Sequence, residues 1–270
     1  MDRRPIGVFD SGLGGLTAVR SLLRILPGED LVYFGDTARV PYGGRSPETI
    51  LKYARQDVRF LRTFDLKAIL IACGTVTTTS LPQLQRENDL PIVGVVEPSC
   101  RAALAATSNG RIGMIATQAS VRSGAYERTL RALDPAVTVI QKACPLFVPL
   151  AEEGRTRPGD PVIETVAEEY LASLRQEGID TLILGCTHYP LLKDVIANVM
   201  GPGVALIDSG EESAKELQRL LTASDSLGEP QGGGAIYCVS DRVEDFQRLA
   251  SRFLGEDVAG AARRVEVEDV

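Results

Sequence analysis

Two apolar runs that each end in a cysteine decide the fold of this chain: Ile69-Leu70-Ile71-Ala72-Cys73-Gly74-Thr75 and Leu182-Ile183-Leu184-Gly185-Cys186-Thr187-His188. A second pair of similar runs precedes them, Ile6-Gly7-Val8-Phe9-Asp10-Ser11 and Ile112-Gly113-Met114-Ile115-Ala116-Thr117. Cys73 follows Ile6 by 67 residues, and Cys186 follows Ile112 by 74. Two matches in the same order and at similar spacing predict an internal duplication.

Short β-branched segments alternate with segments of helical periodicity along the chain, which is typical of a parallel sheet covered by helices. We predict an α/β fold of two pseudo-twofold-related domains, each a mostly parallel sheet flanked by helices. Ligands of such sheets bind at the carboxyl ends of the strands, so the active site should lie in the cleft between the domains. The expected strands are residues 5–9, 31–34, 67–72, 92–96, 111–115, 137–141, 181–184, 204–207 and 235–239.

The second copy of the duplication is complete near residue 206. The last strand and helices should therefore return to the first domain. The expected domains are residues 1–97 plus 207–270, which carry Cys73, and residues 98–206, which carry Cys186.

The clearest helix signal begins at Ser46-Pro47, where serine can cap the helix and proline suits its first position. Apolar residues then recur at helical spacing, and we expect this face to be core and the helix to end near Asp65. The face consists of Ile50, Ala54, Val58, Leu61 and Phe64.

The composition argues against partners of two kinds. The chain of 270 residues carries a formal net charge of −7, whereas a nucleic-acid binder needs a basic surface. The longest strongly apolar run, residues 68–73, is far shorter than the ~20 residues that span a bilayer. The start of the chain lacks the apolar core of a signal peptide, so we expect a cytoplasmic protein that binds neither nucleic acid nor membrane.

Five cysteines, scattered and without CxxC spacing, predict neither a disulfide framework nor a metal site. Cys73 and Cys186 each lie between an apolar strand and a helix, where backbone N–H groups should stabilise a thiolate and lower its pKa. The alternative is that they are small buried apolar residues. Cys100, Cys144 and Cys238 lack this context and are expected to pack in the core.

The glycine-rich turn of residues 10–15 follows the first strand and is expected to bind an anion. A carboxylate-sized anion fits better than a dinucleotide, because Thr17 occupies the third glycine position of the GxGxxG pattern. Asp10 ends an apolar strand and should point into a pocket. Residues 36–45 form a second candidate for substrate contacts, or else only a structural turn.

His188, the only histidine, lies two residues after Cys186, so the two side chains point the same way on an extended segment. It could serve as the base of a thiol nucleophile, as in a peptidase, or tune the thiol, or simply cap the next helix. A peptidase would leave Cys73 unexplained. Of the adjacent carboxylates Glu152 and Glu153, one could enter the cleft.

Two thiols on opposite faces of a bound molecule suit racemisation. A thiolate removes the proton from a tetrahedral carbon while a neutral thiol on the other face donates one, which inverts the centre. Donors arranged around the neighbouring carboxylate must stabilise the carbanion. Asp10 and His188 are placed to tune the two thiols, and no cofactor is needed.

These motifs together resemble the glutamate racemase family, whose members supply D-glutamate for peptidoglycan without a cofactor. The resemblance covers nearly the whole chain, through residues 7–15, 33–36, 41–43, 72–73, 97–98, 147–152 and 185–192. It implies that Cys73 acts on the D-isomer and Cys186 on the L-isomer, and that the chain forms a homodimer. It implies supporting roles for Asp36 and Glu152. The implied substrate contacts are Asp10, Ser11, Tyr42, Gly43, Thr75, Thr187 and His188.

The chain departs from the family at Gly74, where the family usually has asparagine. The missing amide would normally hydrogen-bond the substrate, a contribution of about 1 kcal/mol or more, although the backbone N–H of Gly74 can still bind. Aspartate or another amino or hydroxy acid therefore stays an alternative substrate. A non-catalytic amino-acid-binding protein is a further alternative, although binding alone does not need two opposed thiols. A nucleotide-dependent oxidoreductase rests only on the glycine-rich turn.

Overall fold

The computed structural model describes residues 2–229, 232–255 and 262–267, and within them the strands form two parallel sheets. The strands are β1 (Ile6–Asp10), β2 (Leu31–Gly35), β3 (Ala68–Ile71), β4 (Ile92–Gly94), β5 (Arg111–Ala116), β6 (Thr138–Ala143), β7 (Thr181–Leu184), β8 (Ala205–Asp208), β9 (Ala235–Val239) and β10 (Ala262–Arg264). Every described strand pair is parallel. The α/β prediction is confirmed, and the nine expected strands are all present, whereas β10 was not expected.

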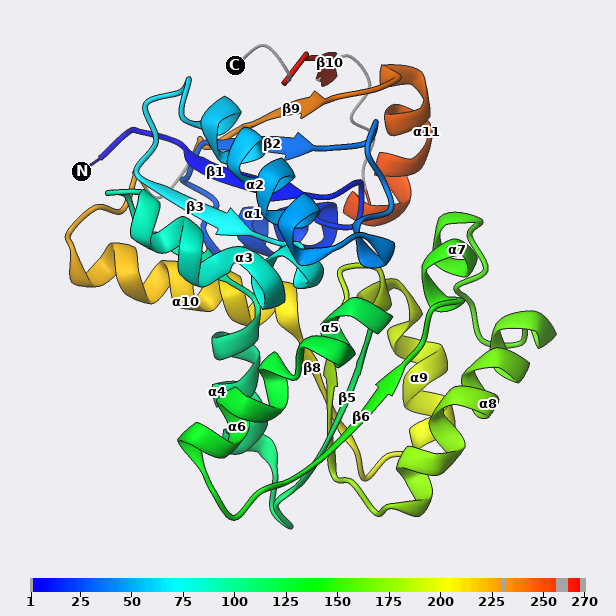
Figure 1. Cartoon of the computed structure of the whole chain (residues 1–270). Helices are drawn as coiled ribbons and strands as arrows, with labels where there is room; N and C mark the ends of the chain where they lie inside the picture. Colours follow the sequence, from blue (N-terminus) through cyan, green and yellow to red (C-terminus); the bar gives the residue numbers. More distant parts are fainter. Residues whose placement is uncertain (1, 230–231, 256–261, 268–270) are drawn as a thin grey trace.

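The two sheets repeat one strand order, as an internal duplication requires. The first sheet runs β10-β9-β2-β1-β3-β4 and the second β6-β5-β7-β8, so β2-β1-β3-β4 matches β6-β5-β7-β8 strand for strand. Cys73 follows β3 and Cys186 follows β7, which are equivalent strands. In Figure 1 the sheets form the upper and lower halves of the molecule.

The chain returns to the first sheet after completing the second. β9 pairs with β2 along its length, and β8 pairs with β7 as far as Asp208. The domain division of 1–97 plus 207–270 and 98–206 stays a prediction.

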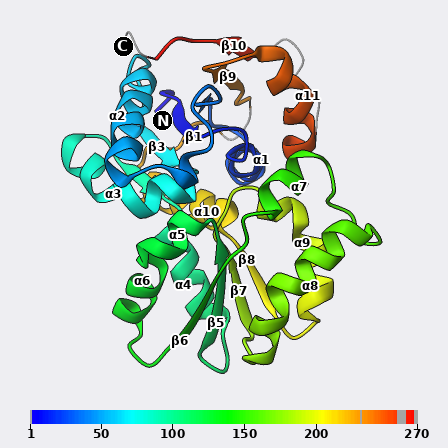
Figure 2. The same cartoon turned by 45° about the vertical axis from the view of Figure 1, so that its right-hand side comes forward.

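Helices cover both faces of each sheet (Figure 2). Their bounds are α1 (Leu16–Ile25), η1 (Tyr42–Gly44), α2 (Pro47–Leu61), α3 (Gly74–Glu87), α4 (Val96–Ala106), α5 (Gln118–Ser123), α6 (Ala125–Leu133), α7 (Phe147–Glu152), α8 (Pro161–Gln176), η2 (Tyr189–Leu192), α9 (Lys193–Met200), α10 (Ser209–Ala223) and α11 (Val243–Leu254), where η1 and η2 are 3₁₀ turns. One core of the first half holds α1, α10 and α11 against the sheet, and the other holds α2 and α3. In the second half, α8 and α9 pack on one face and α4 and α6 on the other.

α2 begins as the sequence predicts and ends earlier. Ser46 caps the helix and Pro47 is its first residue. The helix ends at Leu61 rather than near Asp65, because the N–H groups of Thr63 and Phe64 bond carbonyls three residues back instead of four. Phe64 packs against the same core although the helix has already ended. The apolar spacing in the sequence therefore continues beyond the last helical residue.

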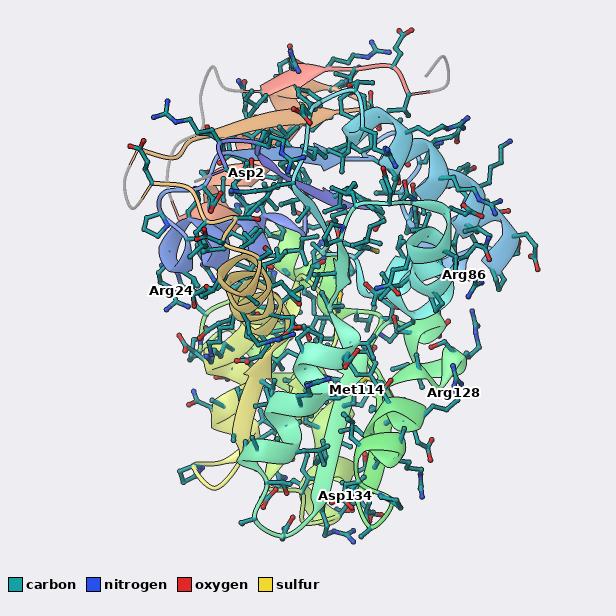
Figure 3. All side chains as sticks on the ribbon, turned by 90° about the vertical axis from the view of Figure 1, so that its left-hand side faces the viewer. Asp2, Arg24, Arg86, Met114, Arg128 and Asp134 are labelled. Atoms are coloured by element: carbon teal, nitrogen blue, oxygen red, sulfur yellow. The ribbon has the colours of Figure 1, made fainter. Side chains whose placement is uncertain are left out.

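The side chains sort by burial as in an ordinary globular protein. Met114, on β5, is fully buried inside the second half, whereas Arg86 and Arg128 lie on the surface (Figure 3). None of the helices in the described residues combines the length and the apolar character that a membrane span needs.

Candidate active site

A cavity of about 650 Å³ lies between the two halves, at the carboxyl ends of β1, β3 and β7. The predicted site residues that line it are Asp10, Ser11, Tyr42, Gly43, Cys73, Gly74, Thr75, Glu152, Cys186, Thr187 and His188. Asp36 is the one predicted residue that does not line it. The fold therefore brings residues from both halves of the sequence, and both strand-end cysteines, to one cavity.

Cys73 sits at the N-cap position of α3, between the strand and the helix as the sequence predicts. Its Sγ donates a hydrogen bond to Ser11 Oγ at 3.3 Å. The expectation of a lowered pKa is wrong for this thiol. Burial, together with the nearby Asp10 carboxylate, raises the pKa of Cys73 to about 12, which outweighs the hydrogen bonds that favour the thiolate. Cys73 is a neutral thiol in this structure.

Asp10 ends β1 and points into the cavity, as expected. Its Oδ2 accepts a hydrogen bond from the Gly12 N–H at 3.0 Å. Its Oδ1 is buried and has no hydrogen-bond partner in the described part of the chain. Burial raises the pKa of Asp10, against the attraction of the nearby His188. An unpaired acceptor oxygen on a residue that lines the cavity suits a cationic ligand group such as an ammonium.

His188 lies between Cys186 and Glu152. Its Nε2 is 2.9 Å from Glu152 Oε1, and the structure assigns the cleft side chain to Glu152 rather than to Glu153. Burial lowers the pKa of His188, but hydrogen bonds and charge attraction to Cys186 and Glu152 outweigh it and raise the pKa to about 10. His188 is therefore an imidazolium at neutral pH, and it lies beside Cys186.

Glycines of the first half lie close to the turn that carries Cys186. A Cβ on Gly74 would lie 2.6 Å from the Gly185 carbonyl oxygen, and a Cβ on Gly14 would overlap Thr187 and His188. Real Cβ atoms essentially never come this close to another heavy atom, so neither position has room for a side chain in this arrangement. Gly74, where the family usually has asparagine, therefore lets the Cys73 turn rest directly against the turn that carries Cys186.

Hydroxyl groups form hydrogen bonds between the two halves of the molecule, next to the cavity. Thr75 Oγ1 lies 3.2 Å from Thr117 Oγ1, and Thr17 Oγ1 donates to the Thr187 carbonyl oxygen at 2.9 Å. Thr117 lines the cavity and was not among the predicted site residues. The signal was present, because Thr117 occupies the place in the second repeat that Ser11 holds in the first.

Asp36 lies behind the cavity wall rather than in it. It is fully buried, and it accepts hydrogen bonds from the Tyr42 hydroxyl and from Arg39 Nε, the latter at 2.6 Å. Its action on a substrate would pass through Tyr42, so the predicted supporting role becomes one of positioning.

The remaining cysteines lie in the cores. Cys100, Cys144 and Cys238 are buried and free, and none of them lines the cavity. This agrees with their expected packing role. Among the described residues, no three histidine, cysteine or acidic side chains gather in a way that would hold a metal ion.

Known proteins resemble this chain over nearly its full length. The family model Asp/Glu/Hydantoin racemase matches residues 6–217. A glutamate racemase of Geobacter metallireducens is 46% identical over 256 residues, which is 94% of each chain. The chain belongs to the glutamate racemase family. The family prediction made from the motifs is confirmed.

Solved structures agree. The glutamate racemase isoform RacE1 of Bacillus anthracis superposes with a TM-score of 0.93 at 37% identity, over 98% of both chains. A glutamate racemase of Francisella tularensis in complex with D-glutamate gives a TM-score of 0.91 at 37% identity, over 100% of both chains. The two-domain architecture of the chain is therefore that of glutamate racemases.

Proposed function

We propose that the protein interconverts L-glutamate and D-glutamate without a cofactor, with Cys73 and Cys186 as the two acid/base residues. The observation that carries this proposal is the placement of two thiols, from equivalent strand ends of the two repeats, on one interdomain cavity. A binding protein needs no such pair. Family membership supports glutamate as the substrate.

The charges around the two thiols favour one starting state. His188 carries a proton beside Cys186, whereas burial and Asp10 keep Cys73 neutral. In the L to D direction the Cys186 thiolate removes the α-proton, and the Cys73 thiol donates its proton to the opposite face. The reverse reaction exchanges the roles, and each turnover leaves the proton on the other sulfur.

Substrate binding in this proposal uses both halves of the cavity. The buried Asp10 carboxylate faces the ammonium group. The hydroxyls of Ser11, Thr75 and Thr187 and the N–H groups at the start of α3 are donors for the carboxylates. These donors also stabilise the carbanion, because charge from the α-carbon spreads into the adjacent carboxylate.

The cellular role proposed is the supply of D-glutamate for peptidoglycan, in the cytoplasm and by a homodimer. These three points rest on the resemblance to the family. Growth of a D-glutamate-requiring bacterium that expresses the chain tests the first, and light scattering of the purified protein tests the oligomeric state.

Circular dichroism of amino-acid solutions tests the reaction and the substrate together. L-glutamate and D-glutamate should each decay to zero signal, with L-aspartate and other L-amino acids much slower. Added pyridoxal phosphate should have no effect. A faster loss of the aspartate signal would make aspartate the substrate, and a dependence on pyridoxal phosphate would contradict the two-thiol mechanism.

A further inference from the structure

A buried polar cluster behind the cavity wall surrounds the guanidinium of Arg39. It joins the loop after β2, the turn η1 and helix α2. Arg39 Nε lies 2.6 Å from Asp36 Oδ2, and Arg39 Nη2 lies 2.9 Å from Asp57 Oδ1. Its Nη1 donates to Gln56 Oε1 at 2.6 Å, and the Tyr53 ring covers the guanidinium carbon at 4.4 Å from the ring centroid. Nothing in the motifs of the sequence indicated Asp57.

The Tyr42 hydroxyl lies between the two carboxylates of this cluster. It is hydrogen-bonded to Asp36 Oδ2 and lies 3.1 Å from Asp57 Oδ2. A phenol has one proton, so it donates to one carboxylate and must accept from the other. Tyr42 is held on both sides only if one of the two carboxyl groups carries a proton and donates it. Asp36 already accepts from Arg39 on Oδ2 and from Ser240 on Oδ1, which leaves Asp57 Oδ2 as the place for this proton.

The charge balance of the cluster supports a protonated Asp57. Asp36 and Asp57 are both fully buried, and Arg39 supplies one positive charge for the two carboxyl groups. Two buried carboxylates would leave one charge uncompensated, which is costly in a low-dielectric interior. Burial and the neighbouring Asp36 raise the pKa of Asp57 well above its usual range.

The loop that carries Tyr42 depends on this cluster for its conformation. Between β2 and α2, the described regular structure is only the short turn η1, Tyr42–Gly44. Ser240 Oγ donates to Asp36 Oδ1 at 2.8 Å and so joins the cluster to the end of β9. Tyr42 and Gly43 line the cavity, whereas Asp57 lies behind them on α2.

We propose that Asp57 is a positioning residue for the substrate: as a hydrogen-bond donor to Tyr42, and as an acceptor from Arg39, it holds Tyr42 and Gly43 at the cavity wall. The inference rests on the proposed racemisation of glutamate. It predicts an effect on substrate affinity rather than on proton transfer, because Asp57 contacts neither thiol.

Two substitutions of Asp57 separate hydrogen bonding from packing. In Asp57→Asn the amide N–H₂ donates to Tyr42 and the amide oxygen accepts from Arg39, so both contacts survive. In Asp57→Leu the number and branching of the side-chain heavy atoms are kept, but both partners lose their hydrogen bonds. We expect Asp57→Leu to raise KM about tenfold or more with kcat changed less than about threefold, and Asp57→Asn to stay within about threefold of wild type in KM.

Glu29→Gln is the matched control, because Glu29 is a buried carboxylate in an ion pair with Lys67, in the loop before β2 and outside the cavity. It should lower the melting temperature without raising KM. Hydrogen exchange of the peptide covering residues 37–46, measured by mass spectrometry without substrate, adds a readout that needs no turnover. Exchange should speed up in Asp57→Leu and stay near wild type in Asp57→Asn and Glu29→Gln.

Three results would overturn the inference: a fall in kcat at unchanged KM in Asp57→Leu, an Asn variant as impaired as the Leu variant, or unchanged exchange of residues 37–46 in Asp57→Leu. A wild-type protein that racemises no amino acid would contradict the proposed function instead. The exchange comparison would still decide the role of Asp57.

Discussion

Single residues divide the cavity into two electrostatically different sides. On the Cys73 side the near charge is the Asp10 carboxylate, and burial adds to its effect on the thiol. On the Cys186 side the near charge is the His188 imidazolium, held by Glu152 at 2.9 Å. The two thiols therefore face opposite charges, and in the proposed reaction they differ in their roles as proton donor and acceptor.

Replacing either cavity cysteine by serine should abolish racemisation. A serine hydroxyl is too weak a base to remove the α-proton and too weak an acid to return one, so Cys73→Ser and Cys186→Ser should each lower kcat by about 10³-fold or more. Circular dichroism of L-glutamate and D-glutamate measures the loss. Cys100→Ala is the control, since Cys100 is buried away from the cavity; activity within a few-fold of wild type in either serine variant would remove that cysteine from the mechanism.

The raised pKa of His188 predicts how stability depends on pH. Because the folded pKa of about 10 exceeds the usual 6.5, the stabilisation is complete below pH 6.5 and is lost as the pH rises toward 10. The free energy of unfolding of the wild type should fall between pH 6.5 and 9, by at most about 1.4 kcal/mol per pH unit from this group. Urea titrations of His188→Gln should show a flatter profile, and parallel profiles would mean that His188 is not charged when folded.

The sequence identified the residues of the site better than their chemistry. Cys73, Cys186 and Asp10 were predicted from strand ends, because a strand end is a local signal. The pKa of Cys73 could not be predicted, since it depends on burial in the folded protein and on the Asp10 carboxylate, which is distant in sequence. Asp57 was missed for a similar reason, because its contacts with Arg39 and Tyr42 join α2 to the loop after β2.

At the scale of elements, helix α11 of the first half contacts site residues that come from the second half. The Phe253 ring packs edge-on against the His188 ring, with 5.3 Å between centroids. Arg252 donates a hydrogen bond to the Glu152 carbonyl oxygen. Helix α11 therefore supports His188 and Glu152, the two residues beside Cys186.

Shortening Phe253 should impair both stability and activity. Phe253→Leu removes buried aromatic contacts, with an expected loss of about 1–3 kcal/mol, and frees the His188 ring to move, which should lower kcat several-fold. Phe60→Leu is the matched control, because Phe60 is also buried but lies in α2 away from the cavity. Denaturant unfolding and steady-state kinetics of both variants are the measurements. Equal kcat in the two variants would deny α11 a role in the site.

The strands were predicted more completely than the ends of the elements. Nine strands follow from short apolar segments between turn signals, whereas β10 has the sequence Ala262-Arg263-Arg264, with no apolar pattern, and is a strand because it pairs with β9. The end of α2 was misplaced because Phe64 continues the apolar spacing beyond the helix. Edge pairing and helix ends depend on tertiary contacts that periodicity does not contain.

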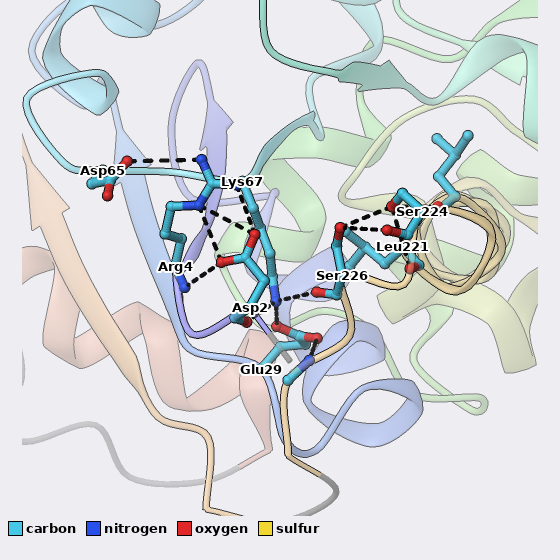
Figure 4. Close-up of polar contacts among 10 residues, drawn as sticks. Asp2, Arg4, Glu29, Asp65, Lys67, Leu221, Ser224 and Ser226 are labelled. Atoms are coloured by element: carbon cyan, nitrogen blue, oxygen red, sulfur yellow. Dashed lines mark hydrogen bonds and ion pairs between the residues drawn. The ribbon is translucent and has the colours of Figure 1, made fainter.

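At the scale of the whole molecule, a buried ion pair holds distant segments together at the amino ends of strands of the first sheet (Figure 4). Lys67 Nζ is paired with Glu29 and donates to the carbonyl oxygens of Asp2 at 2.8 Å and Ser226 at 2.9 Å. The Lys67 and Glu29 side chains are only 1% and 3% exposed. The pair thus joins the start of the chain, the loop before β2, the start of β3 and the segment after α10.

Breaking this pair should destabilise the protein without touching its chemistry. Lys67→Met leaves the Glu29 carboxylate buried and unpaired, which should cost about 3–5 kcal/mol of unfolding free energy. Lys67 precedes β3, whereas the cavity lies where β3 ends, so kcat should be unchanged at a temperature where the variant is folded. The double variant Lys67→Met/Glu29→Gln should recover part of the loss, and a single variant as stable as wild type would contradict the account.

The duplication, which is the largest feature of the molecule, was readable in the sequence because both copies kept a cysteine at the same strand end. The sequence did not reveal how closely the two repeats approach each other in the folded protein. Their contact depends on Gly74 resting against the Gly185 carbonyl oxygen, and one glycine in a sequence does not reveal what lies opposite it.

The central claim is that two thiols on opposite faces exchange the α-proton of glutamate with solvent during inversion. Proton NMR of L-glutamate turned over in deuterium oxide tests it most directly. The D-glutamate formed at early times should carry deuterium at the α-carbon, while the remaining L-glutamate is still largely protonated, and neither serine variant should form product. D-glutamate that keeps the original α-proton, or an absence of any D-glutamate, would contradict the account.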